Sequence, residues 1–177
     1  MMLQMKRILS EWMKEKEGVA AIEAAMIFPI MLMMFLGVFD AGNAILANQK
    51  TVRASQVVAD LITRKSVVSA TDVTEAISAG RLALEPLDSS SFGIDIVSIR
   101  FDEDANSSIE WRETVNMGSL PDALGAVEAL EDEDEGVVMV SVKYVYTPLF
   151  SSFISGPLTM NEVAFSRGRR TPVITHE

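Results

Sequence analysis

Glu23 is the residue whose position most constrains the chemistry available to this chain. It is the one charged residue between Val19 and Phe39, in a run of apolar and small side chains. An ionised carboxylate costs free energy inside a membrane segment, and such residues usually have a partner. No Lys or Arg on the same stretch can reach Glu23. Its partner must therefore come from elsewhere, or the carboxyl must be protonated.

The other reactive residue types offer little for catalysis. The chain has no cysteine, and its single histidine, His176, is next to the C-terminus. This composition excludes disulfides, thiolate metal sites, histidine-based catalytic triads and multi-histidine zinc sites. The serines at 89–91 and 151–152 have no base placed near them by the sequence, so they indicate loops.

The acidic run at residues 131–135 is a candidate calcium site, because calcium prefers several oxygen ligands. It lacks the alternating Asp or Asn residues and the distal Glu of a calcium-binding loop. The alternative is a solvated loop before a strand, as blocks of like charge usually are. We expect no metal site and no cofactor.

The element that carries Glu23 has the length of a membrane span. A helix over residues 19–39 would be roughly 30 Å long, close to the thickness of a bilayer core. Four basic residues precede it, which places the N-terminus in the cytoplasm and the rest of the chain outside: Lys6, Arg7, Lys14 and Lys16. A cleaved signal peptide, an uncleaved signal anchor and a buried soluble helix are the alternatives.

The residues around Glu23 resemble the processing site of type IV pilin-like proteins. There, a short basic leader ends in Gly, and Glu is the fifth residue after it in an apolar helix, as Gly18 and Glu23 are here. The sequence GVAAIE, followed by AAMIFP, looks most like the TadE-like pseudopilins of tight-adherence (Flp-type) pilus systems. Those often have an aromatic residue directly after the Glu, whereas this chain has Ala24, which leaves the TadE-like and TadF-like subgroups unresolved.

The resemblance implies that a membrane-embedded prepilin peptidase cleaves between Gly18 and Val19, and that Glu23 serves subunit assembly. It also implies other pilus or pseudopilin subunits and an assembly platform as partners, with no catalytic activity of the protein itself. The expected organisation is a cytoplasmic leader (1–18), a transmembrane helix (19–39) and an exported, periplasmic domain (40–177), anchored in the inner membrane by one pass.

Periodicity predicts the elements of the exported domain. Ala54, Val58 and Ile62 form one face of an amphipathic continuation of the first helix, with a break near Gly42-Asn43. A second helix is expected to begin with Thr71 as its N-cap and to end before Pro86. Strands are predicted at residues 94–101, at a hairpin partner over 108–112, and at 137–146 and 158–166. Residues 168–172 are predicted to be a tail.

The predicted fold is α+β and pilin-like, with a long N-terminal helix, a short helix and an antiparallel sheet of about four strands. An acidic chain with formal net charge −10 and no basic stripe is not expected to bind nucleic acid. The favoured function is a minor pilin-like subunit that supports assembly of a tight-adherence pilus or secretion apparatus. Two alternatives stay open: an uncleaved, membrane-anchored binding module such as an adhesin, and an exported enzyme with an unrecognised site.

Overall fold

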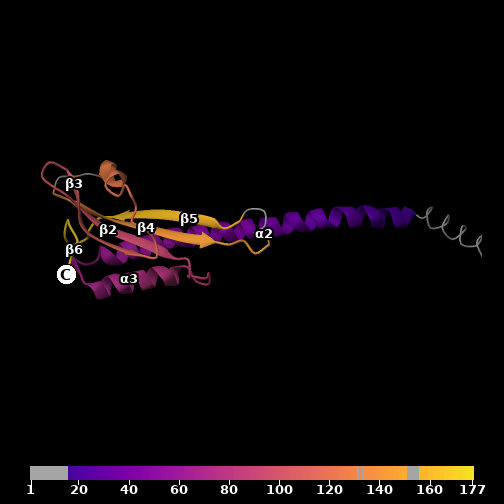
Figure 1. Cartoon of the computed structure of the whole chain (residues 1–177), viewed down its shortest axis with the longest axis horizontal. Coiled ribbons are helices and arrows are strands. Elements are labelled where there is room, and N and C mark those ends of the chain that lie inside the picture. Colours follow the sequence, from indigo (N-terminus) through magenta and orange to yellow (C-terminus); the bar gives the residue numbers. More distant parts are fainter. Residues whose placement is uncertain (1–15, 131, 133, 151–155) are drawn as a thin grey trace, which may run out of the picture.

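The computed structural model describes residues 16–130, 132, 134–150 and 156–177. It confirms the predicted α+β architecture: one long helix projects from a head in which its C-terminal half packs on an antiparallel sheet (Figure 1). The elements in chain order are α2 (Lys16–Ile62), β1 (Val67–Val68), α3 (Ala70–Ala83), β2 (Gly93–Phe101), β3 (Ser107–Val115), the 3-10 helix η1 (Gly125–Leu130), β4 (Gly136–Tyr146), β5 (Leu158–Ser166) and β6 (Thr175–His176).

Helix α2 runs without interruption for 47 residues, so it is about 70 Å long. The predicted break near Gly42-Asn43 is wrong. Asn43 stays helical and its side-chain amide donates to the carbonyl oxygen of Phe39, 3.1 Å away. In the C-terminal half of α2 one stripe of side chains is buried in the head, and this packing keeps the helix straight at Gly42-Asn43. The stripe consists of Asp40, Ala47, Thr51, Ala54, Ser55, Val58, Ala59 and Ile62.

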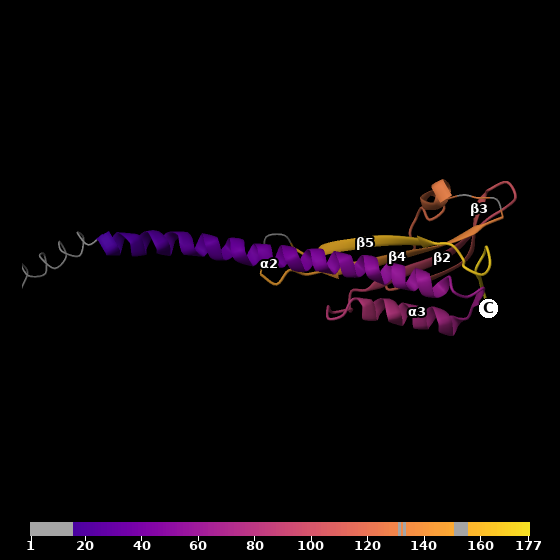
Figure 2. The same ribbon diagram turned by 180° about the vertical axis from the view of Figure 1, so that it is seen from behind.

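The sheet has the strand order β3-β2-β4-β5, and every neighbouring pair is antiparallel. Helices α2 and α3 lie together on one of its faces (Figures 1 and 2). The alternate residues of β4 that the sequence assigned to one face all point into this helix-covered core: Val138, Val140, Val142, Tyr144 and Tyr146. Helices α2 and α3 approach each other closely at Gly80, where an added Cβ would lie 2.7 Å from a methyl group of Val58.

Strand β2 is covered on both faces. Ile94 and Ile96 face the helices, whereas Val97, Ile99 and Phe101 belong to a second apolar cluster under the segment that contains η1. A bulge is also present, as a register shift against β3 between Ser98 and Ile99. Pairing of β2 with β4 is regular.

A buried ion pair holds the η1 segment against the second face. Asp95 is fully buried, and its carboxylate accepts from the Nε of Arg112 at 2.9 Å and from the backbone N–H of Leu120 at 2.8 Å. Arg112 also donates to the carbonyl oxygen of Leu120. The pair therefore links β2, β3 and the covering segment, and no sequence pattern indicated it.

Two details of the predicted domain are wrong. Helix α3 is capped by Ser69 and not by Thr71, because Ser69 and Asp72 form a reciprocal capping box. The C-terminal residues are packed and do not form a tail. Ile174 is buried, its carbonyl oxygen accepts from Ser98 Oγ and Trp111 Nε1, both at 2.8 Å, and β6 pairs in parallel with β1.

The capping box makes the stability of the head dependent on pH. Hydrogen bonds from Lys65 and from Ser69 lower the pKa of Asp72 from 3.8 to about 2. Because the folded-state pKa lies below that of the unfolded chain, the carboxylate stabilises the fold above about pH 4, and this stabilisation is lost as the pH falls through about 2. We expect Asp72→Asn to lower the melting temperature at neutral pH, and the difference from the wild type to shrink below about pH 4.

Thermal unfolding followed by circular dichroism across this pH range checks the expectation. Glu75→Gln, an exposed change on the same helix, is the matched control and should have little effect at any pH. A deficit of Asp72→Asn that stays constant down to about pH 2 would contradict the role of the carboxylate.

Candidate functional site

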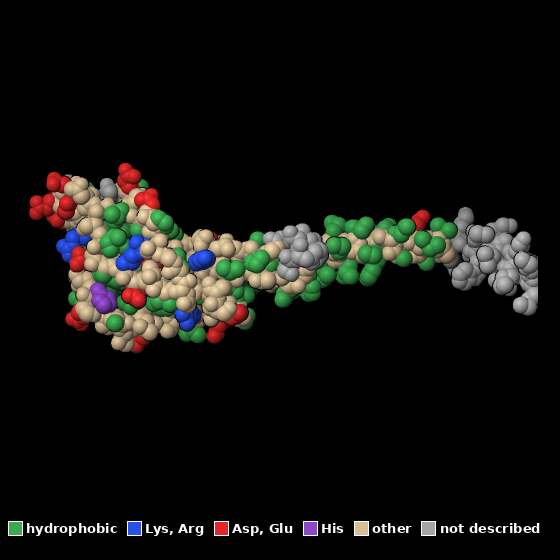
Figure 3. All heavy atoms as spheres, in the orientation of Figure 1, with side chains coloured by type: hydrophobic (Ala, Val, Ile, Leu, Met, Phe, Trp, Pro, Cys, Tyr) green, Lys and Arg blue, Asp and Glu red, His purple; other side chains and the backbone are tan. Residues whose placement is uncertain are grey.

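The N-terminal half of α2, residues 18–39, is the most unusual surface of the described chain. Its large apolar side chains are exposed almost without exception, among them Met26 and Phe35 at 71 % and 68 %. Figure 3 shows this half as a rod covered by hydrophobic side chains beyond the head. The helix is long and apolar enough to cross a membrane, with a mean hydropathy of 2.3 over its most apolar window. A soluble protein rarely leaves so large an apolar surface uncovered, so this half is suited to a membrane.

Glu23 is exposed on this rod, together with Gly18 and Val19. Val19 and Glu23 are four residues apart in the helix, so they lie on one face with a rise of about 6 Å between them. Within the described residues, Glu23 makes no ion pair and no hydrogen bond through its side chain. The structure therefore agrees with the sequence that a partner for this carboxylate is not supplied by the same stretch of helix.

Gly18 has no packing role in the described structure, because nothing lies within 4 Å of a Cβ added to it. This distinguishes it from Gly80, whose hydrogen is required by the contact with Val58. Gly18 lies in the first turn of the described helix, and glycine favours the helical conformation less than alanine does. The helix therefore has a weak point directly before Val19 for which the fold gives no packing reason.

Asp40 marks the point where the rod enters the head. Its side chain is only 2 % exposed, and its two carboxylate oxygens accept from the backbone N–H groups of Leu149 and Phe150, at 3.1 and 2.9 Å. Phe39 packs edge-on against Phe150, with ring centroids 5.8 Å apart. These contacts fasten the connection after β4 to α2. Sequence reasoning took Asp40 only as the first charge after the span, and no local signal showed its partners.

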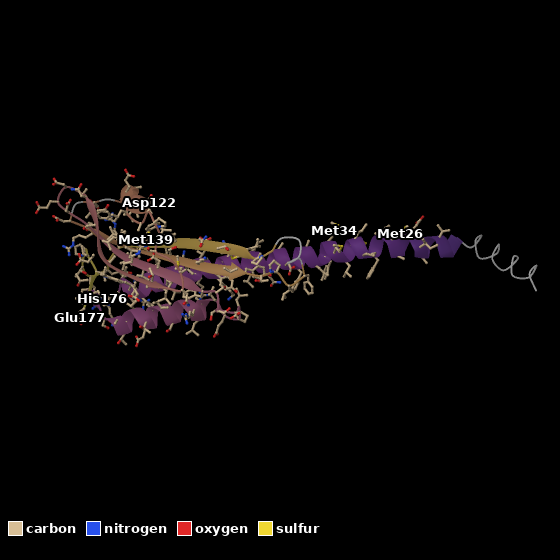
Figure 4. All side chains as sticks on the ribbon, viewed as in Figure 1. Met26, Met34, Asp122, Met139, His176 and Glu177 are labelled. Atoms are coloured by element: carbon tan, nitrogen blue, oxygen red, sulfur yellow. The ribbon has the colours of Figure 1, made fainter. Side chains whose placement is uncertain are left out.

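The head shows no arrangement typical of a catalytic centre among the residues described. His176 lies beside Trp111, with ring centroids 5.6 Å apart, at the end of the molecule remote from Met26 and Met34 (Figure 4). Ser91 is engaged with the backbone N–H and carbonyl of Val145, as a structural link between β4 and the loop before β2. Serines 151 and 152 lie outside the described residues.

Two cavities of the head contain hydroxyl side chains, but none of these hydroxyls is hydrogen-bonded to a histidine among the described residues. One, of about 320 Å³, lies between α3 and β3 and is lined in part by Arg81, Glu113 and His176. The other, of about 430 Å³, is lined by Asn43, the loop after α3 and the end of β4. Thr74 and Ser78 also line the first cavity, but their hydroxyls donate to the backbone carbonyl oxygens of Ala70 and Thr74. In the second cavity the hydroxyl of Ser90 donates to the exposed carboxylate of Asp88.

The acidic run is described only in part, since residues 131 and 133 lie outside the described residues. Asp132 and Glu135 both face Arg167, at 3.1 and 3.6 Å from its Nη1. Among the residues described, no group of three or more acidic, histidine or cysteine side chains could hold a metal ion. The described acids of this run therefore balance a neighbouring arginine.

The family model of the TadE-like proteins matches residues 18–60. The segment is TadE-like. This match confirms the resemblance and extends it from Gly18 through the apolar half of α2 into the half that packs in the head. Neither a search of curated proteins nor one of solved structures found a match.

The TadE-like match suggests a protein associated with the tight-adherence pilus and anchored in a membrane by its N-terminal helix. It also implies association with other components of that pilus, and the family is structural and not known for enzymatic activity. The match begins at Gly18 and includes Glu23 and Asp40, so the sequence features of the exposed rod and its junction with the head belong to the matched segment.

Asp40 should be essential for the junction between rod and head. In Asp40→Asn an NH2 group, which donates and cannot accept, replaces one carboxylate oxygen, so the N–H of Leu149 or Phe150 loses its acceptor. We expect the full chain in detergent micelles to lose about 1 to 3 kcal/mol of unfolding free energy, the range for buried hydrogen bonds to a charged group. Denaturant unfolding measures this, with Glu75→Gln as the control. An Asp40→Asn protein as stable as the control would show that the junction does not depend on these hydrogen bonds.

Proposed function

We propose that this protein is a minor pilin-like (pseudopilin) subunit that supports assembly of a tight-adherence pilus or secretion apparatus. In this proposal residues 1–18 are a cytoplasmic leader, 19–39 a transmembrane helix and 40–177 an exported, periplasmic domain. The single observation that carries the proposal is the position of Glu23: it lies one helical turn after Val19, on an uncovered apolar helix, inside a TadE-like segment.

Processing explains Gly18. A prepilin peptidase that cuts between Gly18 and Val19 must reach a backbone that is helical in the uncut chain. Glycine lowers the cost of opening the helix there, and no packing contact in the described structure is lost when it opens. The basic residues of the leader keep the cleavage site on the cytoplasmic side.

Cleavage would give Glu23 a counter-charge. The new α-amine at Val19 has an ordinary pKa near 8 and is mostly protonated at neutral pH. It would lie at nearly the same membrane depth as Glu23, because the two residues are one turn apart. Pairing the amine of one subunit with Glu23 of a neighbour removes the cost of an unpaired charge in an apolar layer. A contact within one chain satisfies the same two groups, and the experiment below separates the two arrangements.

The head then has a mechanical function and not a catalytic one. Because α2 is continuous and its second half is buried against β4, β5 and α3, the position of the rod fixes the position of the head. A subunit added through its rod would present its head in one orientation. The alternative of an uncleaved, membrane-anchored adhesin uses the same rod and head but requires neither Gly18 nor an amine at Val19.

The test is Glu23→Gln in the native cells, a change that keeps the shape of the side chain and removes its charge. Intact-mass analysis should find both the wild type and the variant beginning at Val19. Crosslinking to other pilus subunits and pilus yield should fall at least about tenfold in the variant, since loss of an ion pair in an apolar layer is worth more than 1.4 kcal/mol. Glu75→Gln, an exposed carboxylate on α3, should behave as wild type.

Two results would contradict the proposal in different ways. A mature protein that still begins at Met1 would favour the anchored adhesin-like module. Correct processing with normal pilus yield in Glu23→Gln would show that the carboxylate is a tolerated polar residue and has no role in assembly. A third result, reduced pilus yield with correct processing and unchanged crosslinking between subunits, would keep the role of Glu23 and assign its pairing to the interior of one chain.

A further inference from the structure

The uncharged part of α2 is too short to cross a membrane by itself. Between Glu23 and Asp40 the helix carries no charge, and this stretch is about 24 Å long, whereas a hydrocarbon core is about 30 Å thick. Any tilt of the helix shortens its reach further. If Glu23 and its paired amine lie at the cytoplasmic edge of the apolar layer, that layer extends beyond Asp40 on the other side.

The surface of α2 beyond Asp40 agrees with this. Ile45 and Leu46 are 62 % and 43 % exposed, and the first basic residue after the span is Lys50. Extending the layer to Leu46 gives a length of about 35 Å, which a slightly tilted helix accommodates. Asp40 then lies inside the apolar layer or at its interface with water.

The connection after β4 lies at the same depth. Leu149 is 72 % exposed and Phe150 is 44 % exposed, and both are held at Asp40 by their backbone N–H groups. Phe150 also contacts Phe39, a residue of the span. Figure 1 shows this connection at the end of the head that faces the projecting half of α2. The exposed apolar surface of the rod is thus joined to the head by the contact of Phe39 with Phe150.

The backbone of this connection at residues 148–150 exposes no unpaired N–H group, which suits an apolar environment. Irregular backbone is excluded from lipid because each unpaired polar group there costs several kcal/mol. Pro148 has no N–H group, and the next two N–H groups both donate to the Asp40 carboxylate. In return, these two bonds help to compensate the burial of the Asp40 carboxylate. One interaction therefore satisfies both the acid and the loop.

We infer that Leu149 and Phe150 form a second membrane contact that enters the lipid interface beside α2, with Asp40 fastening it to the span. The inference rests on the proposed span and goes beyond it: the head lies on the bilayer at a fixed tilt and does not stand away from it on a free stalk. The occupant is lipid, because the surface adjoins the membrane-type face of α2 at Phe39 and the N–H groups of Leu149 and Phe150 are already paired.

The test uses single cysteines, which are unique labels because the chain has none. The full chain is reconstituted in vesicles of phosphatidylethanolamine and phosphatidylglycerol and labelled with an environment-sensitive fluorophore. Leu149→Cys is compared with Val38→Cys, which is equally exposed at 72 % but lies on the span, and with Phe165→Cys, which is 41 % exposed on β5 of the head. Quenching is measured with a lipid that carries a spin label near its headgroup and with aqueous iodide.

We expect lipid quenching at position 149 to be within about twofold of that at 38 and at least about fivefold greater than that at 165. Iodide should show the reverse order. A label at 149 that iodide reaches as freely as at 165, while 38 is quenched by lipid, would overturn the inference and leave the span intact. A label at 149 that is shielded from both quenchers only when other pilus subunits are present would also overturn it, by assigning the surface to a protein partner. A label at 38 exposed to iodide would instead overturn the span itself.

Discussion

The structure depends on one constraint: a single unbroken helix must satisfy two different environments. The first half of α2 exposes nearly every large apolar side chain, and the second half buries only a stripe against the sheet and α3. A helix can do both because its backbone hydrogen bonds are internal and stay satisfied in lipid and in water. The side chains alone change along its length. Everything else in the head is arranged around the buried stripe, from the contact of Gly80 with Val58 to the residues of β4 that face the helices.

The point of transition is Asp40, and its chemistry shows how the two environments are joined. A charged residue at this position would normally mark the end of a span, held in water. Here the carboxylate is buried and its bonds to the N–H groups of Leu149 and Phe150 bring a distant part of the sheet to the helix. The rod is therefore fixed to the head at both ends of the buried stripe, at Asp40 and at Thr63, whose carbonyl oxygen accepts from the N–H of Arg169.

The sequence predicted those elements whose signal is periodic. The apolar run, the amphipathic face at Ala54, Val58 and Ile62, and the alternation in β4 are repeated patterns, and the structure confirms all three. Predictions from a single local residue did less well. Gly42-Asn43 looks like a helix break, but packing on either side keeps α2 continuous. Ser69 and not Thr71 is the N-cap of α3, because Asp72 completes the capping box with Ser69.

Contacts between distant residues had no signal in a single sequence. Asp95 with Arg112, Asp40 with the loop after β4, and Ile174 with Ser98 and Trp111 each join segments by hydrogen bonds that leave no periodic trace. For the candidate site the division is similar. The spacing of Gly18, Val19 and Glu23 is local and could be found, and the TadE-like match begins at the same glycine. The role of Asp40 is nonlocal and needed the fold.

The central claim is that α2 is one rigid helix from the membrane-type half into the head, and a distance measurement tests it most directly. Spin labels on cysteines at Met26 and Gln49, both exposed and on opposite sides of Asp40, can be placed in the cysteine-free chain and measured by pulsed dipolar spectroscopy in vesicles. A continuous helix predicts one narrow distance population, with an axial separation of about 35 Å. A broad distribution, or a population much shorter than this, would show a hinge near Gly42-Asn43 and contradict the account.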